Sequence, residues 1–390
     1  MSSIIQKEML PKMRWRYGKR GKKGKTVLIN ELCEQWGYER KHAIKLLNGT
    51  FFQKKKTKRK RGRPARYGKE VIEVLLFLAK ASDWPCGKRL AVIKTLWLPY
   101  YEEAHGKLEP EIREQLKSIS AAQIDRLLAP YKVKRGKSWT KPGSILKTQI
   151  PIRTDNWDVT MPGFFEADTV AHCGGSLEES FIWSLTFTDI YSQWTCNRAT
   201  WNKGAAGVVE AIACIEKNLP FEILGFDSDN GSEFLNYHLI DYFHKRPKKV
   251  GFTRSRPYHK NDNAYVEQKN YTHVRHLLGY DRLEDPEMIP LINELYREVW
   301  EPYNNFFMPC MKLIKKERHG SKIKRLHDKP LTPCDRLLQS PHLSEEIKEE
   351  LRLKRASLNP IELKKLLEQL LRKIFAHQKT FLAKQANSQG

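Results

Sequence analysis

Residues 226–234 have the sequence FDSDNGSEF, in which an apolar run ends and polar side chains crowd a turn. The run before it, residues 221–226, is typical of a buried strand, and residues 233–244 have the pattern of a helix. Sites in α/β proteins form where strands end and helices begin. Asp229 is expected to leave the sheet at this edge, whereas Asp227 would point to the opposite side if the strand continues. The stretch predicts an α/β fold, although Asp-Asn-Gly alone is also an ordinary turn sequence.

The elements on both sides of this turn complete the pattern. Short apolar or alternating runs predict strands at residues 164–170, 181–188, 193–199, 221–226 and 249–253. Amphipathic stretches predict helices at residues 204–217, 233–244 and 263–277. The order βββαβαβα predicts a mixed five-stranded sheet with helices on its faces, which is the ribonuclease H-like arrangement.

A second carboxylate lies inside the first predicted strand. Asp168 belongs to residues 164–170, FFEADTV, which are otherwise mostly apolar. A carboxylate at the centre of a strand is costly unless it is paired, bound to metal or open to solvent. Glu166 lies two residues earlier on the same strand face and is the local alternative to Asp168 as the first ligand.

A third carboxylate follows a polar loop. Residues 256–270 have the sequence RPYHKNDNAYVEQKN, in which a proline and a polar cluster precede a predicted helix. Glu267 lies about one turn into that helix. Helical spacing makes Asn263, Asn270 and Tyr271 its neighbours, with Arg275 two turns on.

Together, these three segments resemble one family. The stretch SDNGSEF at residues 228–234, the Asp168–Thr169 pair and the NDNA segment before Glu267 are similar to the signature of bacterial insertion-sequence DDE transposases. Their catalytic core is related to that of retroviral integrases, and the resemblance covers about residues 160–280. Between Asp229 and Glu267 lie 37 residues, slightly more than in the commonest form. The His/Cys zinc module of retroviral integrases is absent from the sequence, and helix-turn-helix elements are expected in its place.

The resemblance implies that Asp168, Asp229 and Glu267 are the catalytic residues and the metal ligands. Carboxylate oxygens suit Mg²⁺ or Mn²⁺, and two ions about 3.5–4 Å apart can stabilise the attacking and leaving oxygens. The implied function is that of a DNA transposase: water cleaves the phosphodiester at the element's end, and the freed 3′-hydroxyl attacks target DNA. A nuclease of the same fold without strand transfer, or an inactive DNA-binding regulator, is the alternative.

Positive charge is concentrated near the beginning of the chain. The formal net charge is +25, and residues 1–70 hold 22 Lys and Arg residues against 5 Asp and Glu residues. Clustered positive charge indicates a polyanionic partner, here double-stranded DNA.

The basic region also has the pattern of a DNA-binding motif. Residues 1–25 are expected to be a basic arm, and helices at 27–36 and 39–47 with Gly37 between them predict a helix-turn-helix. The second helix would present Arg40, Lys41 and Lys45 to a major groove. The run KKKTKRKRGRP at residues 54–64 is typical of a phosphate-binding arm, with a solvated linker as the alternative. Its candidate contacts are Lys58, Arg59, Arg61 and the minor-groove hook residue Arg63.

Further DNA contacts are expected along the chain, each with a structural alternative. A helix begins at Ser120, with Gln123 completing a capping box, and ends at Pro130. It is either a second recognition helix or a packing helix that leads into a basic linker. Near Glu267, the side chains of Lys260, Lys269 and Arg275 either grip phosphates or lie on ordinary helix surface.

The remaining expectations concern domains and surroundings. Four parts are expected: a basic arm with helix-turn-helix, a second helical DNA-binding region with a linker, the catalytic core and a helical C-terminal extension, at residues 1–67, 68–150, 151–285 and 286–390. After Tyr280, a loop-rich stretch with several prolines should lead into two helices. The last helix should begin at the Asn359 cap, and its apolar face would pack on the body or on a second subunit. Pairing two element ends implies a homo-oligomer in the DNA complex.

Cysteine spacing and hydropathy predict a cytoplasmic, nucleoid-associated protein without a membrane partner. The seven cysteines lack the spacing of a metal site, the N-terminus lacks an apolar signal region, and the apolar run at residues 74–79 is too short to cross a membrane.

Overall fold

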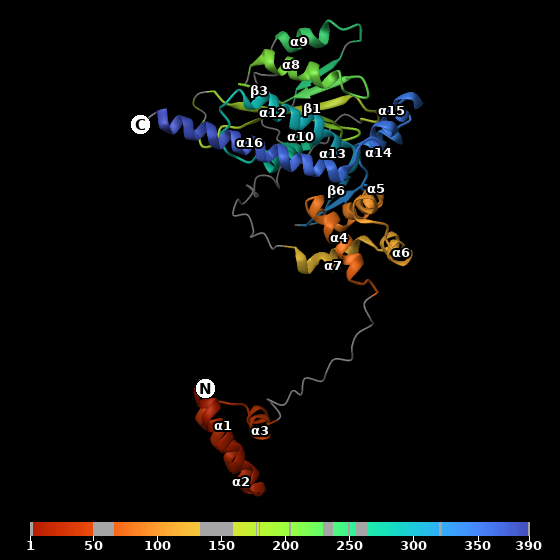
Figure 1. Ribbon diagram of the computed structural model, residues 1–390. Coiled ribbons are helices and arrows are strands. Elements are labelled where there is room, and N and C mark those ends of the chain that lie inside the picture. The colour runs from red at the N-terminus through yellow and green to blue at the C-terminus, as the bar shows by residue number, and fades with distance from the viewer. Residues whose placement is uncertain are drawn as a thin grey trace. The chain divides into compact units, whose positions relative to one another are not determined.

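The structure is a computed structural model. The structure describes residues 3–49, 66–132, 159–176, 178, 180–202, 204–228, 237–248, 250–254, 264–319 and 322–388. The chain forms two compact units, Met1–Arg66 and Tyr67–Gly390 (Figure 1). The second unit has one hydrophobic core, to which residues before 150, between 151 and 285, and after 285 all contribute. The expected division of this unit into three parts stays a prediction.

Residues 3–49 of the first unit form three helices: α1 (Ser3–Gly18), α2 (Lys22–Trp36) and α3 (Arg40–Leu47). Gly37 ends α2 in the left-handed conformation, with φ of 64°, and its backbone N–H donates to Cys33 O. A left-handed residue is the usual C-terminal stop of a helix and favours glycine. The helix–glycine–helix expectation is therefore confirmed. The expected arm at residues 1–25 is wrong, because Met13 of α1 packs into the same core as Leu28, Leu32 and Ala43.

The second unit begins with a bundle of four helices: α4 (Lys69–Ala81), α5 (Gly87–His105), α6 (Pro110–Ser118) and α7 (Ala121–Leu128). A short 3₁₀ turn, η1 (Ala129–Tyr131), follows them. Ser120 caps α7 by accepting a hydrogen bond from Gln123 N at 3.3 Å, as the sequence predicts. Gly87 begins α5 where any side chain would collide with Ala121 O, so glycine allows α5 and α7 to pack closely.

A mixed sheet of five strands follows: β1 (Phe164–Ala171), β2 (Ile182–Asp189), β3 (Thr195–Trp201), β4 (Gly225–Ser228) and β5 (Gly251–Arg254). Their order is β3-β2-β1-β4-β5. The β1–β2 and β2–β3 pairs are antiparallel, whereas β1–β4 and β4–β5 are parallel. The predicted mixed five-stranded sheet is confirmed, although β4 begins at Gly225 rather than at residue 221.

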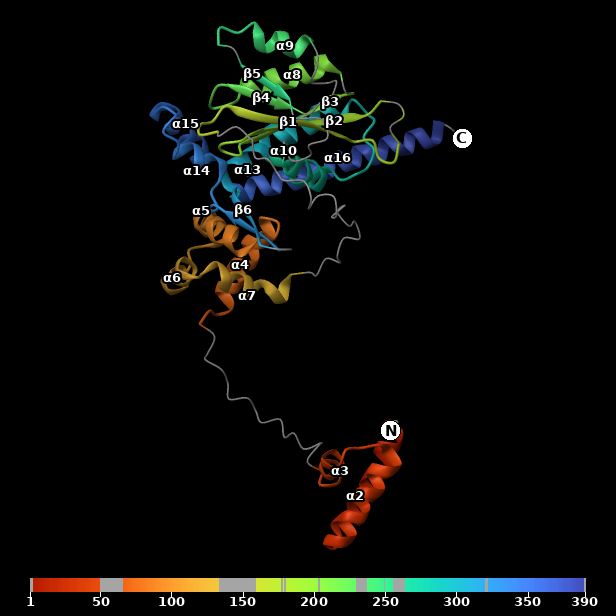
Figure 2. The ribbon, with the colours of Figure 1, turned by 180° about the vertical axis from the view of Figure 1, so that it is seen from behind.

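Helices cover both faces of the sheet (Figures 1 and 2). One face carries α8 (Ala205–Glu216) and α9 (Tyr237–His244). The other carries a continuous helix made of α10 (Ala264–Lys269), the π-helical segment η3 (Asn270–Arg275) and α11 (His276–Leu278). A second continuous helix joins α12 (Met288–Glu294), the π-helical η4 (Leu295–Trp300) and α13 (Glu301–Phe307).

Side chains of this second helix pair with the outer edge of β3. Asn305 accepts from Thr195 N and donates to Thr195 O, both at 3.0 Å. Asn293 does the same with Ala199, at 2.7 and 3.0 Å. Between them, Glu301 Oε1 accepts from Asn197 N at 2.9 Å. The edge groups of alternate residues are thus satisfied by a helix instead of a sixth strand, which protects the sheet from edge-to-edge pairing.

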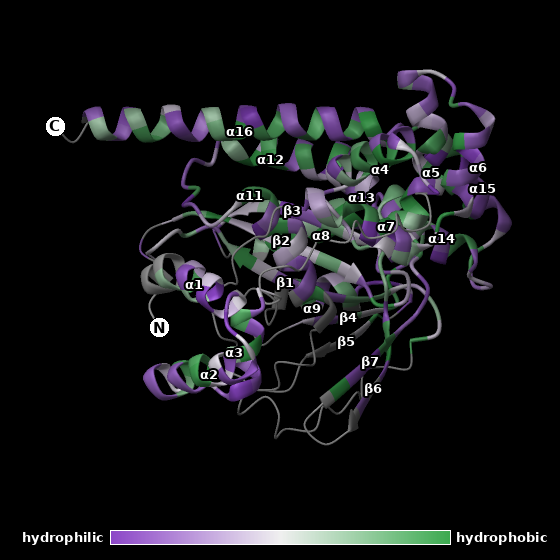
Figure 3. Ribbon diagram, turned by 90° about the horizontal axis from the view of Figure 1, so that it is seen from below, coloured by the Kyte–Doolittle hydropathy of each residue, from purple (hydrophilic) through white to green (hydrophobic). Residues whose placement is uncertain are grey.

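The C-terminal region was expected to be loops and two helices, and it contains more. A hairpin of β6 (Leu313–His319) and β7 (Lys322–His327) forms a separate two-stranded sheet (Figure 3). Helices α14 (Pro333–Leu338), α15 (Glu345–Ala356) and α16 (Pro360–Ser388) follow. Asn359 caps α16 by accepting from Ile361 N at 2.9 Å, which confirms the predicted start.

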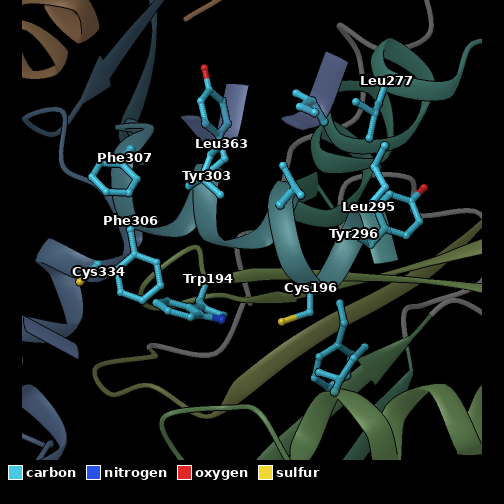
Figure 4. Close-up of a cluster of buried hydrophobic side chains, with 14 of the residues drawn as sticks. Trp194, Cys196, Leu277, Leu295, Tyr296, Tyr303, Phe306, Phe307, Cys334 and Leu363 are labelled. Atoms are coloured by element: carbon cyan, nitrogen blue, oxygen red, sulfur yellow. The ribbon is translucent and has the colours of Figure 1, made fainter. Parts of the chain in front are cut away.

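A single core joins the helical bundle, the sheet and the C-terminal helices. Trp97 of α5 lies edge-to-face with Tyr303 of α13, with ring centroids 5.8 Å apart, and Trp97 Nε1 donates to Phe307 O. Trp194 packs against Phe306, and Leu363 of α16 belongs to the same cluster (Figure 4). The apolar face of α16 therefore packs on the body of this chain. Within the described residues, no helix combines the length and apolarity needed to cross a membrane.

Candidate active site

Asp168 lies in β1, the central strand of the sheet, and is half-buried. Its Oδ2 accepts a hydrogen bond from Asn270 Nδ2 at 2.6 Å, and its Oδ1 accepts from Thr169 N at 2.7 Å. Asn270 Oδ1 is buried and has no hydrogen-bond partner among the described residues. Asn270 thus brings an amide oxygen to the helix turn that contacts the Asp168 carboxylate, and both groups are hard oxygen donors of the kind that Mg²⁺ prefers.

Glu166 has a different environment from Asp168. Its side chain is 1% exposed, and its Oε2 accepts from the backbone N–H of Val266 at 3.0 Å. Val266 lies in the first turn of α10, where backbone N–H groups have no partner within the helix. Glu166 therefore fixes the start of α10 against β1. This contact favours Asp168 over Glu166 as the ligand, because Asp168 keeps access to solvent.

The second expected ligand, Asp229, and the rest of its signature at residues 230–234 lie outside the described residues. The strand before it is described: β4 runs parallel to β1, and Ser228 is in register with Ala167. Ser228 therefore ends β4 beside the residue that precedes Asp168. Asp227 pairs with Glu166 one step earlier along the same two strands.

The third expected ligand, Glu267, lies in α10, which packs against β1 and β2. Its side chain is outside the described part of the molecule. One turn further along the same helix, Asn270 makes the hydrogen bond to Asp168. The sequence gives Asn270 as a neighbour of Glu267, but not as a partner of Asp168. The only sequence signal for that pairing was a polar side chain one turn from the expected Glu.

The expected DNA-binding residues have varied surroundings. Arg40, Lys41 and Lys45 are exposed on α3, and Arg40 donates to Asn30 Oδ1 at 2.6 Å. Arg275 donates to Ala171 O at 2.8 Å, and its guanidinium lies over the Tyr280 ring, so it holds η3 to the sheet. Outside the described residues lie Lys58, Arg59, Arg61, Arg63 and Lys260.

Lys269 has surroundings unlike those of a surface cation. Burial lowers the pKa of Lys269, and the nearby Arg89 and Arg336 guanidiniums lower it further, against the opposing effect of Cys310. The residue lies two positions after Glu267, beside the chain segment that leads into β6. Lys269 therefore links the helix that carries Glu267 with the C-terminal region.

A buried polar chain lies at the far end of β1. His172 Nε2 and Ser184 Oγ are 2.8 Å apart, and Ser184 Oγ is 2.9 Å from the Tyr296 hydroxyl. His172 Nδ1 is buried and has no hydrogen-bond partner among the residues described. Burial lowers the pKa of His172 to about 3, and the Arg275 guanidinium contributes in the same direction. The folded protein therefore holds His172 in its neutral form at neutral pH.

We expect His172 to make the protein less stable in mild acid. In the unfolded chain this imidazole binds a proton near its ordinary pKa of about 6.5, whereas the folded chain excludes that proton until about pH 3. The free energy of unfolding should therefore fall by about 1.4 kcal/mol per pH unit below about pH 6. Urea unfolding between pH 7.5 and pH 4.5 should show a shallower fall for His172→Phe. Equal pH dependence of both proteins would show that His172 titrates normally.

Another group of potential ligands lies far from Asp168 in the sequence. Asp285, Glu287 and His377 have ligand atoms within 4.8 Å of one another. His377 Nε2 is 2.6 Å from Asp285 Oδ2, and Asp285 Oδ1 accepts from Glu287 N at 3.0 Å. These contacts join the middle of α16 to the start of α12. Because the carboxylate is already hydrogen-bonded on both oxygens, the group is explained as a structural contact.

Comparison with solved structures gives three partial similarities. The chain is similar to the catalytic core of BIV integrase (16% identity, TM-score 0.23, covering 30% of this chain and 66% of that one). It is also similar to the HTLV-2 integrase catalytic core solved with magnesium (15% identity, TM-score 0.23, covering 30% and 71%). A simian T-cell lymphotropic virus intasome bound to the PP2A regulatory subunit B56 gamma gives 11% identity, a TM-score of 0.27 and coverage of 46% and 59%. Two of the three are matched over less than two thirds of their length. Such low TM-scores support no conclusion about activity.

Sequence comparison then defines the family. No protein-family model matches the chain. The uncharacterized protein y4rM of Sinorhizobium fredii (strain NBRC 101917 / NGR234) is 35% identical over 342 residues, covering 86% of this chain and 96% of y4rM. The chain therefore belongs to the same protein family as y4rM.

Proposed function

We propose that this protein is a DNA transposase that cleaves at the ends of a mobile element and transfers the freed 3′-hydroxyl into target DNA. The observation that carries the proposal is the surroundings of Asp168. A half-buried carboxylate lies on the central strand, beside the end of β4 and under the helix that carries Glu267. Each of the three expected carboxylates therefore belongs to, or directly follows, an element that borders the same region.

Chain connectivity supports the grouping of Asp168 with Asp229. Consecutive Cα atoms are about 3.8 Å apart. Ser228 of β4 is in register with Ala167 of β1. Asp229 and Asp168 directly follow these two residues in the sequence, which favours their grouping at one site. Helix α10 is fixed on this part of β1 by two contacts 102 and 100 residues apart in sequence: Asn270 to Asp168 and Val266 to Glu166.

The donor chemistry fits a hard divalent cation. Asp168, Asp229 and Glu267 would hold Mg²⁺ or Mn²⁺, and two ions are expected. When bound, such ions stabilise negative charge on the attacking and leaving oxygens of a phosphodiester. The chain's own residues prepare the site. Asn270 orients the Asp168 carboxylate, and Glu166 fixes the start of the helix on which Asn270 and Glu267 lie.

DNA binding is proposed for the basic segments outside this centre. Arg40, Lys41 and Lys45 lie on the exposed side of α3, which follows the Gly37 turn as a recognition helix would. The run at residues 54–64 adds further positive charge after α3 in the sequence. Two copies holding two element ends would form the expected homo-oligomer.

Two other functions compete with this proposal. A nuclease of the same fold would cleave DNA without joining it, and a regulator would bind DNA without cleaving it. The presence of all three carboxylates in the sequence disfavours the regulator. The nuclease differs only in its products, so a joining assay is needed.

We expect metal-dependent joining of element ends to a plasmid. The purified protein would be incubated with labelled DNA from both sides of its own gene, a supercoiled plasmid and Mg²⁺. Cleaved ends and plasmid-joined products should both appear, and both should disappear when EDTA removes the metal. Cleaved ends without joined products would favour the nuclease. Retarded DNA without cleavage would favour the regulator.

A further inference from the structure

The β6–β7 hairpin has an unusual composition for a surface ribbon. Residues 313–327 include six Lys and Arg residues and one Glu. Among those with described side chains, Lys315, Lys324 and Arg325 are exposed. Lys315 pairs with Glu317 at 2.9 Å, so even this acidic residue is shared with a cation of the same hairpin. The ribbon therefore presents a strongly positive surface.

The hairpin also exposes aliphatic side chains. Ile314 is 63% exposed, Leu326 52%, Leu313 41% and Ile323 38%. A two-stranded ribbon without a covering layer is marginally stable in water by itself. Aliphatic side chains spaced among cations on such a ribbon have no role in the core described above, since they lie outside it. Their exposure indicates contact with a partner.

The base of the hairpin is firmly anchored, in contrast to its exposed strands. Asp328 Oδ1 accepts from Lys312 N at 2.6 Å, and Asp328 N donates to Lys312 O at 3.0 Å. Arg336 of α14 donates to Asp328 Oδ2 at 2.5 Å and to Cys310 O at 3.1 Å. Lys312 Nζ also reaches Tyr191 O, in the turn between β2 and β3, at 2.9 Å. The direction of the ribbon is therefore fixed relative to the sheet.

The anchored base also contacts α5 and lies near the end of α10. Arg89 of α5 donates to Pro309 O at 2.5 Å, just before the hairpin. Lys269 lies close enough to Arg89, Cys310 and Arg336 to interact with them electrostatically. Lys269 belongs to α10, the helix that also carries Glu267, so the hairpin base lies against the same helix as the expected ligand.

We propose that the β6–β7 hairpin is a DNA-binding arm that holds duplex DNA. The major groove admits a two-stranded ribbon, and seven residues of strand reach about 23 Å along it. Lysine and arginine side chains would pair with phosphates, and the aliphatic side chains would contact thymine methyl groups. A protein partner would also cover the aliphatic side chains, but the excess of positive charge favours the polyanion. The inference rests on the proposed function, since it assigns DNA to this surface.

The test compares DNA binding by the full chain and by two charge variants. Lys324→Ala/Arg325→Ala removes two exposed cations of the hairpin, and Lys373→Ala/Lys379→Ala removes two exposed cations of α16. Fluorescence anisotropy with a labelled duplex of about three helical turns would give the dissociation constant between about 50 and 200 mM salt. Each lost phosphate contact should reduce the slope of log K against log salt by about 0.9, so the hairpin variant should lose about 1.8. Its affinity near 0.1 M salt should fall by roughly tenfold or more.

The controls separate charge, folding and the proposed function. Lys324→Arg/Arg325→Lys should keep the slope of the wild type, and all variants should unfold at the same temperature. A hairpin variant that changes no more than the α16 variant would overturn the arm while leaving the transposase proposal intact. A wild type with no salt-dependent affinity for duplex DNA would overturn both. Loss of single-strand binding alone would also contradict the arm, because the ribbon is assigned to duplex.

Discussion

Asp168→Asn is expected to abolish strand cleavage and joining while leaving the fold and DNA binding unchanged. The substitution keeps the size of the side chain and removes the charge that a divalent ion requires. Metal ions stabilise the transition state of phosphoryl transfer by several kcal/mol, so the rate should fall on the order of a thousandfold or more. Single-turnover cleavage of element-end DNA would measure the rate, and anisotropy would measure the binding.

Glu166→Gln is the matched control for this prediction. Its amide oxygen can still accept the hydrogen bond from Val266 N, which the carboxylate accepts at 3.0 Å. The variant should therefore keep most of the activity that Asp168→Asn loses. The opposite result, with Glu166→Gln inactive and Asp168→Asn active, would make Glu166 the first ligand.

Glu301→Ala is expected to destabilise the protein by about 3–5 kcal/mol. Arg198 is 3% exposed on β3 and forms an ion pair with Glu301, whose side chain is 11% exposed. Removing the carboxylate leaves a buried guanidinium without its charged partner, and it also removes the acceptor for Asn197 N. Urea unfolding at neutral pH would show the loss as a lower midpoint with an unchanged slope.

The double variant Arg198→Met/Glu301→Leu separates the ion pair from its environment. When both charges are replaced by apolar groups of similar volume, neither is left buried and unpaired. We expect the double variant to be more stable than Glu301→Ala. A double variant that is as unstable as Glu301→Ala would instead show that the pair itself stabilises the edge of β3.

Local patterns predicted most of the sheet and its helices, because β1, β2, α8 and the helix beginning at α10 each have a continuous apolar periodicity. The predicted start of β4 was wrong for a reason that local patterns cannot reveal. The apolar side chain of Phe221 packs against the core without belonging to the strand: its ring stacks on that of Phe165, with centroids 5.8 Å apart. The strand itself begins only at Gly225, where pairing with Phe164 starts.

The C-terminal region was harder to predict for two physical reasons. The prolines after Tyr280 suggested loops. Pro302, however, lies in the first turn of α13, directly after the π-helical η4, where the hydrogen-bond ladder already changes. None of the described side chains of the hairpin is buried, so its mixture of cations and aliphatic residues gave no strand signal of the usual kind.

For the candidate site, the sequence indicated which residue types to consider but not how they contact one another. Asp168 and Asn270 are 102 positions apart in the sequence, and Ala171 and Arg275 are 104 positions apart. Such pairings depend on how α10 and η3 lie across β1. The roles of Asp229 and Glu267 remain predictions from the resemblance.

The shared contacts of α5 with α13 and α16 bear on how this protein can be dissected. A fragment beginning at residue 151 would contain every strand of the sheet, yet it would lack Trp97 and Tyr100, which pack on Tyr303 and Phe307. It would also lose the backbone carbonyl of Ala81, to which the Tyr303 hydroxyl donates at 2.8 Å. The isolated catalytic region would therefore expose aromatic surface and tend to aggregate. The smallest soluble fragment should begin near Tyr67.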